Sequence, residues 1–253
     1  MRENVGGDIV IDNTHLNKKS LDKKIEFAKS LGYDISFQNM YNPKRGYDFM
    51  AGRDRSTYTH KEYLQDCLKR NLFRYETSGK KVPWSVIHRM YLQNYPLTEK
   101  YIVCDLDGTL FEIGHRLHYL KWEKKDRDGF YSEIAGDGLY EHIRELLDMY
   151  WSNWYTIVLV SGRPDTYWYV THKMLEKYKI TYDHLLMRSW WDHRPDVDVK
   201  KEIYNNCLYK KMEPDDFREW VKPTVCIDDR PRICDLWRSL GLNVLQVWDG
   251  VDF

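Results

Sequence analysis

The fold of this chain is decided by the stretch VCDLDGTL at residues 103–110. An apolar run leads into Asp105 and Asp107, and then into Gly108, which can take the positive φ of a tight turn. Because residues i and i+2 of an extended strand share one face, both carboxylates can converge on one site, where a divalent cation would offset their repulsion. A plain Asp-Gly hairpin turn is the alternative. The apolar strand in front and the complete D-x-D-G-T pattern favour the functional interpretation.

Outward from this stretch, short apolar runs alternate with amphipathic runs. Strands are expected over 101–105, 155–160, 183–187, 223–227 and 243–247, and helices over 138–151, 165–178, 198–208 and 231–240. That alternation predicts an α/β fold with a doubly wound parallel sheet and right-handed crossovers. In such sheets, ligands bind beyond the carboxyl ends of the strands.

The strand expected over 155–160 ends in a candidate phosphate site. Ser161, Gly162 and Arg163 follow it directly. A hydroxyl and a glycine amide at a strand end, leading into a helix, can cradle a phosphate. An ordinary strand-to-helix turn in which Asp165 caps the helix is an equal alternative.

The strand expected over 223–227 ends in two adjacent acids, Asp228 and Asp229. Burying such a pair is costly unless a cation satisfies the carboxylates. Because Mg²⁺ prefers oxygen ligands and typically takes one or two carboxylates, we expect at least one of the two to be a metal ligand.

Residues 186–200 form a fourth segment that is dense in cations. Lys200, early in an expected helix, can neutralise a transferring phosphoryl group and hold the carboxylate of the nucleophile. Arg188 and Arg194 lie in the same segment, and a plain charged loop is the alternative for both.

These four segments resemble the haloacid dehalogenase (HAD) superfamily in order and spacing. The resemblance implies that Asp105 attacks phosphorus to form an aspartyl-phosphate. It implies that Asp107 protonates the leaving oxygen and then activates water. It also implies a Mg²⁺ ion bound by Asp105, by the Asp107 main-chain carbonyl and by an acid of the Asp228/Asp229 pair.

The same resemblance implies a set of groups around the substrate phosphate. Lys200 would act as a catalytic cation, and the phosphate-binding groups would be Thr109, Ser161, Gly162, Arg163, Arg188 and Arg194. Only about 45 residues separate Thr109 from the second strand, and much of that length is the helix expected over 138–151. We therefore expect a capless, open site that admits the end of a polymer or a protein.

A closer resemblance is to the 3′-phosphatase domain of phage-type polynucleotide kinase-phosphatases, and it spans residues 100–253. It is carried by MR at 187–188, RPD at 194–196, VKKEI at 199–203, CIDDR at 226–230, LWRSLG at 236–241, LQV at 245–247 and GVDF at 250–253. The resemblance implies Mg²⁺-dependent removal of 3′-phosphates from nucleic-acid ends, in end repair. The alternatives are a phosphatase of small nucleotides or phosphoproteins, and a non-catalytic subunit that completes a split kinase.

Trp190 and Trp191 lie between two arginines of the cation-rich segment. Aromatic side chains in such a place can stack a terminal base, an interaction of roughly 1–3 kcal/mol per base. Filling the core is the equal alternative for one or both.

Residues 7–98 resemble the latter part of the 5′-kinase domain of the same enzymes, so a partial P-loop-kinase-like domain is expected over 1–98 and the phosphatase domain over 99–253. The matching elements are a strand at 9–11, a helix at 21–32, a lid-like helix at 67–74 and a further helix at 81–91. No G-x-x-x-x-G-K-[ST] motif occurs in the chain, so we expect no 5′-kinase activity from it alone.

This partial domain has three interpretations: half of a split kinase, a degenerate docking module or a truncation. A parallel sheet that lacks its P-loop strand exposes edges, which predicts a separate kinase chain or a homo-oligomer as partner.

Charge and composition set the outer limits. The chain has 39 Lys and Arg against 39 Asp and Glu, but residues 1–98 have 17 against 11 and residues 99–253 have 22 against 28. Five cysteines without a C-x-x-C pair indicate reduced thiols in a cytoplasm-like compartment, the host cytoplasm if the chain is phage-encoded. No run approaches the roughly 18 to 20 apolar residues of a membrane span.

Overall fold

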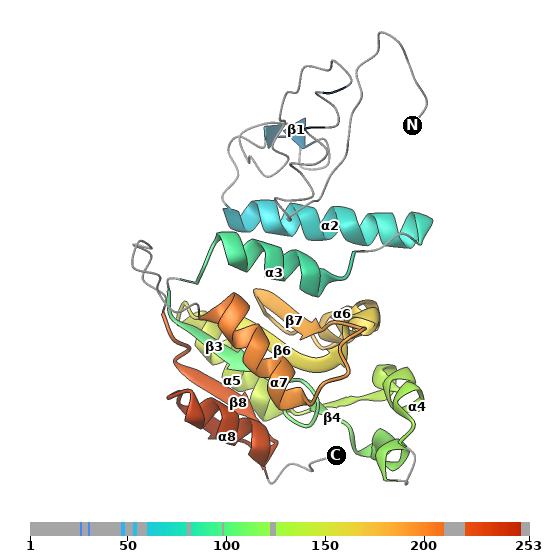
Figure 1. The fold of residues 1–253 in the computed structure, drawn as a ribbon, viewed down its shortest axis with the longest axis vertical. Helices are drawn as coiled ribbons and strands as arrows, with labels where there is room; N and C mark the ends of the chain where they lie inside the picture. The colour runs from blue at the N-terminus through green and yellow to red at the C-terminus, as the bar shows by residue number, and fades with distance from the viewer. Residues whose placement is uncertain are drawn as a thin grey trace. The chain divides into compact units, whose positions relative to one another are not determined.

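A five-stranded parallel sheet carries the segments singled out above (Figure 1). Its strands are β3 (Tyr101–Cys104), β6 (Thr156–Pro164), β7 (His184–Arg188), β8 (Val225–Asp228) and β9 (Val244–Gln246). They are ordered β7-β6-β3-β8-β9, and each neighbouring pair is parallel. The chain therefore winds outward from β3 in both directions, and the stretch at 103–110 begins at the central strand. The predicted doubly wound α/β fold is confirmed.

The structure is a computed structural model, and it describes most of the chain from residue 60 onward. The described residues are 60–79, 82–97, 99–121, 125–209 and 221–248, together with Glu26, Ser30, Tyr47–Asp48 and Arg53–Asp54. The chain divides into two compact units, residues 1–57 and residues 58–253.

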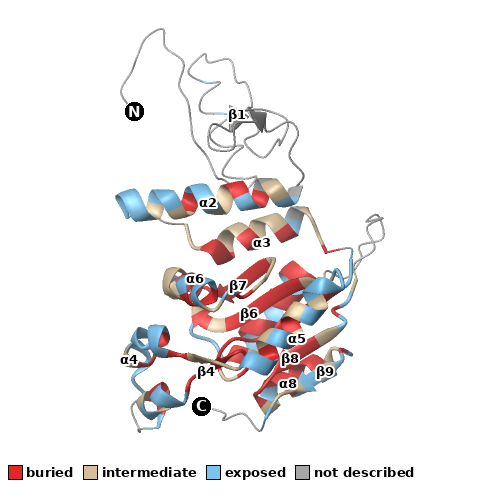
Figure 2. Cartoon of the chain, turned by 180° about the vertical axis from the view of Figure 1, so that it is seen from behind, coloured by how far each residue is buried: buried red, intermediate tan, exposed pale blue. Residues whose placement is uncertain are grey.

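Two apolar layers enclose the sheet because successive residues of a strand face opposite sides. Ile102 and Cys104 of β3 belong to one buried cluster, whereas Tyr101 and Val103 belong to the other. Helices α5 (Glu141–Ser152) and α6 (Trp168–Lys177) cover the first face, and α7 (Asp196–Ile203) and α8 (Pro231–Ser239) cover the second. Figure 2 shows strands β6, β7 and β8 as largely buried.

The element bounds differ from expectation at two places. β6 extends to Pro164, and its pairing with β7 shifts register between Ser161 and Pro164, so the expected phosphate segment is part of the strand. The helix expected over 198–208 begins at Asp196, directly after Pro195, and ends at Ile203. A π-helical turn, η5 (Tyr204–Leu208), completes it.

The insertion between β3 and β6 is small. It consists of β4 (Phe111–Glu112), η2 (Gly114–Leu120), α4 (Arg127–Ser132), η3 (Ile134–Gly136) and β5 (Gly138–Leu139), followed by α5. β4 and β5 pair as a two-stranded antiparallel ribbon. Within the described residues, this insertion forms no separate cap domain, as the segment lengths predicted.

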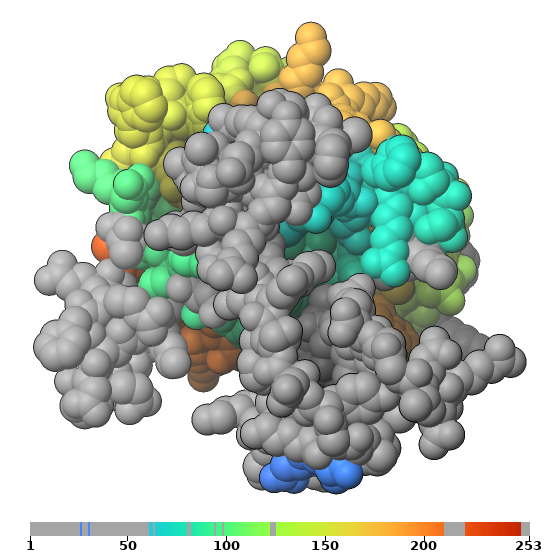
Figure 3. All heavy atoms as spheres, turned by 90° about the horizontal axis from the view of Figure 1, so that it is seen from above, coloured from blue at the N-terminus to red at the C-terminus, as the bar shows by residue number. Residues whose placement is uncertain are grey.

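Two helices that precede the sheet in sequence pack within the same unit, residues 58–253. They are α2 (His60–Ser78) and α3 (Trp84–Asn94), and the exposed part of α2 is cyan in Figure 3. Trp84 of α3 belongs to the buried cluster on one face of the sheet, and Leu92 belongs to the cluster on the other. Between them, Arg89 Nη2 donates to the Met187 carbonyl at 2.5 Å. α3 therefore covers edge strand β7, whose unpaired groups would otherwise invite association.

In the first unit, β1 (Tyr47–Asp48) and β2 (Arg53–Asp54) pair antiparallel. The strand predicted at 9–11 lies outside the described residues. The helix predicted at 21–32 also does, apart from Glu26 and Ser30, which are helical. No helix in the described ranges is both long enough and apolar enough to cross a bilayer.

Candidate active site

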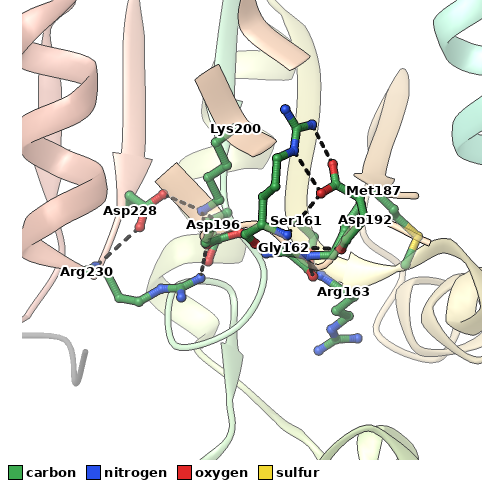
Figure 4. Close-up of polar contacts among 12 residues, drawn as sticks. Ser161, Gly162, Arg163, Met187, Asp192, Asp196, Lys200, Asp228 and Arg230 are labelled. Carbon is green, nitrogen blue, oxygen red and sulfur yellow. Dashed lines mark hydrogen bonds and ion pairs between the residues drawn. The ribbon is translucent and has the colours of Figure 1, made fainter. Parts of the chain in front are cut away.

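Polar side chains converge beyond the carboxyl ends of the central strands (Figure 4). Asp105 directly follows β3, and Asp228 is the last residue of β8. Ser161 lies in the last part of β6, and Lys200 reaches the same region from α7. The sequence prediction that these four segments meet at one edge of the sheet is confirmed.

Lys200 joins Asp105 and Asp228. Its Nζ lies 2.7 Å from Asp105 Oδ1 and 2.8 Å from Asp228 Oδ2, and all three side chains are buried. Burial lowers the pKa of Lys200, but the surrounding carboxylates, that of Asp105 above all, outweigh burial and raise the pKa well above its ordinary value. Lys200 therefore keeps its proton and supplies a fixed positive charge.

Asp229 is held by the turn that follows the first aspartate. The buried Thr109 hydroxyl donates to Asp229 Oδ1 at 3.0 Å. Gly108 has a φ of +86°, and a Cβ added there would collide with the Asp229 carboxylate, so only glycine fits this turn. Sequence reasoning placed Thr109 among the phosphate-binding groups, whereas the structure directs its hydroxyl to an acid of the metal pair.

Three carboxylates fit a divalent metal ion. Asp105, Asp228 and Asp229 each offer an oxygen atom, and the three atoms lie within 4.8 Å of one another. Asp105 Oδ2 is buried and has no hydrogen-bond partner among the described residues. Burial, followed by repulsion from Asp228, raises the pKa of Asp229. An all-oxygen donor set with an orphaned buried oxygen suits Mg²⁺, which requires such ligands.

The Asp107 side chain is not a member of this group and contacts two buried arginines instead. Its Oδ1 accepts hydrogen bonds from Arg116 Nη2 at 2.5 Å, and from Arg163 Nε at 2.8 Å and Nη2 at 2.5 Å. Burial raises the pKa of Asp107, but Arg163 and Arg116 outweigh burial and hold it well below its ordinary value. The Asp107 side chain therefore lies outside the group of carboxylates that could hold a metal ion, and its carboxylate is kept ionised. The expected metal ligand from this residue is the main-chain carbonyl, and that expectation stays a prediction.

A second buried acid completes the arginine side. Asp137 accepts from Arg116 at 2.6 and 2.8 Å and from Arg163 Nη2 at 2.7 Å. Arg116 also stacks over Phe130, 4.1 Å from the ring centroid. Arg163, predicted from sequence to bind phosphate, has its guanidinium in this network instead, because two buried carboxylates surround it.

Sequence reasoning missed Arg116 and Asp137. Both come from the small insertion, Arg116 from η2 and Asp137 from the residue after η3. The stretch around Arg116 has no motif that separates it from exposed arginines such as Arg127. Its burial depends on how the insertion folds back onto Asp107, which no local pattern records.

Arg188 organises the loop between β7 and α7. Its guanidinium donates to the Gly162 carbonyl at 2.9 Å, to the Arg194 carbonyl at 2.6 Å and to Asp196 Oδ1 at 3.1 Å. A Cβ on Gly162 would collide with the Asp196 carboxylate, so β6 and α7 approach closely here. These contacts favour a role for Arg188 in positioning Asp196 and the loop over the expected contact with phosphate.

Asp196 and Arg230 are further members of the site that sequence reasoning did not assign. Arg230 Nη2 donates to Asp196 Oδ2 at 2.5 Å, and the Arg230 amide donates to Asp228 Oδ1 at 3.2 Å. Burial raises the pKa of Asp196, but Arg230 and then Lys200 outweigh it and lower the pKa. The sequence motifs that contain these two residues, Arg-Pro-Asp at 194–196 and Asp-Asp-Arg at 228–230, could have indicated them.

The residues at the rim are exposed. The Arg194 side chain, 48% exposed, bonds Asp192 Oδ2 at 2.6 Å and also pairs with Glu202. Trp190 and Trp191 are 61% and 60% exposed, so the alternative that they fill the core is wrong. Trp191 helps to line a cavity of about 140 Å³ between α3 and α7.

The chain is similar to known proteins in both sequence and fold. A family model described as the polynucleotide kinase PNKP phosphatase domain matches residues 99–253. A chain of the Pnkp1/Rnl/Hen1 complex is 31% identical, over 63% of this chain and 48% of that chain, with a TM-score of 0.47. A chain of the Pnkp1/Rnl/Hen1 RNA repair complex is 29% identical, over 75% and 63%, with a TM-score of 0.49.

A HAD family enzyme from Bacteroides thetaiotaomicron, in complex with magnesium and inorganic phosphate, is 14% identical over 61% of this chain and 96% of that chain, with a TM-score of 0.38. This chain covers less than two thirds of the length of either repair-complex chain. The family match is what assigns it, because the matched residues are more than half of the chain and contain Asp105, Lys200 and Asp228. The chain belongs to the HAD-type phosphomonoesterase family of the polynucleotide kinase PNKP phosphatase domain.

Proposed function

We propose that this chain is a Mg²⁺-dependent phosphatase that removes 3′-phosphates from nucleic-acid ends through an aspartyl-phosphate on Asp105. One observation carries the proposal. The buried Asp105 carboxylate has Oδ1 fixed by Lys200, while Oδ2 has no hydrogen-bond partner among the described residues and lies in the group formed with Asp228 and Asp229. A carboxylate that is oriented on one side and open on the other is suited to nucleophilic attack.

The reaction proceeds in two displacements. A bond forms between an Asp105 carboxylate oxygen and phosphorus while the bond from phosphorus to the 3′ oxygen breaks, and the 3′ oxygen takes up a proton. Water then hydrolyses the acyl-phosphate, which releases inorganic phosphate and regenerates the carboxylate. Lys200 holds Asp105 in place and offsets negative charge throughout. Mg²⁺, held by Asp105, Asp228 and Asp229, would supply further charge neutralisation at the phosphoryl group.

Asp107 is the candidate proton carrier. Arg116 and Arg163 keep its carboxylate ionised before substrate binds, which suits the step in which it takes a proton from the attacking water. To protonate the 3′ oxygen in the first step, Asp107 has to gain a proton, and its hydrogen bonds to the arginines have to loosen. The two arginines therefore set when Asp107 can act as an acid.

The substrate assignment rests on access and on family. The short insertion leaves the carboxyl edge of the sheet without a separate cap domain among the described residues, so the end of a polymer can approach it. Relatives of the matched region occur in a Pnkp1/Rnl/Hen1 RNA repair complex. By that likeness we propose that the chain heals RNA or DNA ends together with a separate partner chain, and that residues 1–98 form a partial kinase-like segment without 5′-kinase activity of its own.

A release assay tests the proposal. The full chain is incubated with Mg²⁺ and a 3′-phosphorylated oligonucleotide, as RNA and as DNA. Parallel reactions contain the 5′-phosphorylated isomer, a free nucleoside 3′-monophosphate, a phosphopeptide and p-nitrophenyl phosphate. We expect phosphate release from the 3′-phosphorylated strand at the highest kcat/KM, dependence on Mg²⁺, and no release by the Asp105→Asn variant.

Asp235→Asn provides the matched control, because the Asp235 carboxylate is 73% exposed on α8 and pairs only with Arg238 in the described surface. It should retain full activity. Release from p-nitrophenyl phosphate or the free nucleotide without release from either oligonucleotide would contradict the polynucleotide assignment. Preferential release from the phosphopeptide would replace it with a protein substrate.

A further inference from the structure

An aromatic cluster borders the turn that carries the two catalytic aspartates. Trp248 packs against Tyr140, with ring centroids 4.7 Å apart, and against His142, whose ring meets it edge-on at 4.9 Å. The Trp248 side chain is nevertheless 45% exposed. The cluster thus holds a large aromatic ring in place while part of it faces solvent.

Two hydrogen bonds place Trp248 beside the acids. The Val247 amide donates to the Asp228 carbonyl at 3.0 Å, and Trp248 Nε1 donates to the Gly108 carbonyl at 2.8 Å. Gly108 in turn abuts the Asp229 carboxylate, since any Cβ there would collide with it. The segment that carries Trp248 is therefore attached to both loops that supply the metal-binding carboxylates.

Tyr140 gives an independent indication of the same location. Its amide donates to the Leu110 carbonyl at 3.0 Å, at the end of the catalytic stretch. Burial raises the pKa of the Tyr140 hydroxyl, and the carboxylates of Glu112 and Asp229 add to the rise. The Tyr140 hydroxyl is therefore close enough to Asp229, an acid of the metal group, to interact with its charge.

The backbone of Trp248 is also unusual. Its φ is +79°, a conformation that bulky residues rarely adopt and that persists only where surrounding contacts impose it. The Gly108 hydrogen bond and the two neighbouring rings are described contacts that hold this residue's side chain. Such a conformation, at a half-exposed indole next to a cluster of acids, is typical of a surface that receives a ligand.

We propose that Trp248, supported by Tyr140 and His142, stacks against the terminal nucleobase of the 3′-phosphorylated strand. This inference rests on the proposed function, because it assumes that the 3′-phosphate occupies the group of Asp105, Asp228 and Asp229. The terminal base is joined to that phosphate through a single sugar, so it has to lie beside the acids, where the indole is. Stacking on an aromatic face tolerates any base, as an end-repair enzyme requires.

Trp190 and Trp191 are the competing platform, and the structure favours Trp248 over them. No described ring packs against either of the two, whereas Trp248 is supported on two sides. Trp191 also faces a cavity lined by Arg89 and Cys207, on the α3 side of the loop. A supported ring loses less conformational freedom when a base stacks on it, which favours binding.

The experiment compares three substrates: a single-stranded oligonucleotide with a 3′-phosphate, the same oligonucleotide with an abasic terminal nucleotide, and p-nitrophenyl phosphate. Wild type should prefer the intact oligonucleotide over the abasic one by roughly 5- to 150-fold in kcat/KM. Trp248→Ala should lose that preference, chiefly through KM. Trp248→Phe, which keeps an aromatic face and deletes the hydrogen bond to Gly108, should retain most of it.

The controls separate stacking from support of the catalytic turn. Trp154→Ala removes an indole that is 90% exposed two residues before β6, at the amino ends of the parallel strands, and should leave every rate unchanged. If Trp248→Ala lowers turnover of all three substrates equally, Trp248 acts through Gly108 and the stacking proposal is overturned. It is also overturned if wild type does not distinguish the abasic end, or if Trp191→Ala and not Trp248→Ala abolishes the preference.

The comparison of intact and abasic oligonucleotides uses the wild-type protein alone. It therefore tests the proposal even if Trp248→Ala folds poorly. Failure of the proposed function gives a different result, in which wild type hydrolyses p-nitrophenyl phosphate and neither oligonucleotide.

Discussion

Asp105 and Asp107 are separated by one residue of the same turn, and both are buried, yet their surroundings are opposite. Asp105 Oδ1 accepts a hydrogen bond from Lys200, whereas Asp105 Oδ2 has no hydrogen-bond partner among the described residues. Asp107 accepts three hydrogen bonds from Arg116 and Arg163. Burial raises the pKa of Asp105, and this effect is larger than the lowering by Lys200. For Asp107 the two arginines outweigh burial, so its pKa is lowered.

Counting charges explains the difference. The metal side has Asp105, Asp228 and Asp229 against Lys200, an excess of two negative charges that one Mg²⁺ ion would balance. The arginine side has two acids, Asp107 and Asp137, against two arginines, and is already balanced. One half of the site is therefore organised to receive a cation, and the other is complete as it stands.

The largest effect should come from Asp105→Asn. An amide cannot attack phosphorus, so turnover of every substrate should fall by roughly 10⁴-fold or more, as removal of a nucleophile does in other enzymes. The measurement is single-turnover phosphate release with p-nitrophenyl phosphate and with the 3′-phosphorylated oligonucleotide. Residual turnover within tenfold of wild type would show that Asp105 is not the nucleophile.

Arg116→Ala tests how much the arginine side of the site contributes to the stability of the fold. Removing one partner leaves Asp107 and Asp137 to share Arg163 in a buried site, and breaking a buried ion pair in this way costs about 3–5 kcal/mol of unfolding free energy. Urea unfolding measures the loss. The matched control is Arg144→Ala, which removes an arginine that pairs with Glu141 and Asp148 on the surface of α5. Equal, small losses for both variants would mean that the arginine side contributes nothing special to stability.

The comparison also shows which parts of this molecule a sequence can predict. The five strands and their helices follow from apolar periodicity, and the metal group follows from two local motifs, because Asp105, Asp228 and Asp229 all stand directly at strand ends. In a parallel sheet such positions necessarily meet at one edge. The position of Lys200 is predictable for the same reason, because it lies on α7, the helix that follows the carboxyl end of β7.

The arginine side could not be predicted in this way. Arg116 and Asp137 belong to an insertion with no periodic pattern, and their burial depends on a fold-back that leaves no local trace. The sequence places Arg163 in a phosphate site directly after the strand expected over 155–160, but β6 continues through it to Pro164. The packing of α3 on β7 is not expected from the sequence, which assigns α3 to the partial kinase-like domain over 1–98 and β7 to the phosphatase domain over 99–253.

Magnesium binding should stabilise the folded protein through the metal side alone. At a Mg²⁺ concentration of 100 times its Kd, linkage raises the free energy of unfolding by about 2.7 kcal/mol. Thermal melts in Mg²⁺ and in EDTA should show the rise for wild type and for Asp235→Asn, and a much smaller one for Asp229→Asn. An undiminished rise in Asp229→Asn would place the ion elsewhere.

The two aspartates should also respond to pH in opposite directions when Mg²⁺ is absent. A lowered pKa means that Asp107 stabilises the fold above its unfolded pKa, near 3.8, and that this stability is lost as pH falls. A raised pKa means that ionising Asp105 costs stability as pH rises above 3.8. In EDTA at neutral pH, Asp105→Asn should therefore melt at or above the wild-type temperature, and Asp107→Asn below it. Shifts of the same sign would contradict the division of the site.

The smallest effect should come from Glu202→Gln, because the ion pair that it removes lies at the rim. Arg194 is 48% exposed there, and it remains bonded to Asp192 through Nε at 3.0 Å and Nη2 at 2.6 Å after Glu202 loses its charge. Solvent and salt screen such a pair, so the melting temperature should change by less than about 2 °C. KM for the oligonucleotide should stay unchanged, because Asp192 still holds the guanidinium. A fall in KM that disappears at high salt would mean that freeing Arg194 strengthens a phosphate contact, and it would extend the substrate site beyond the two buried halves to this exposed loop.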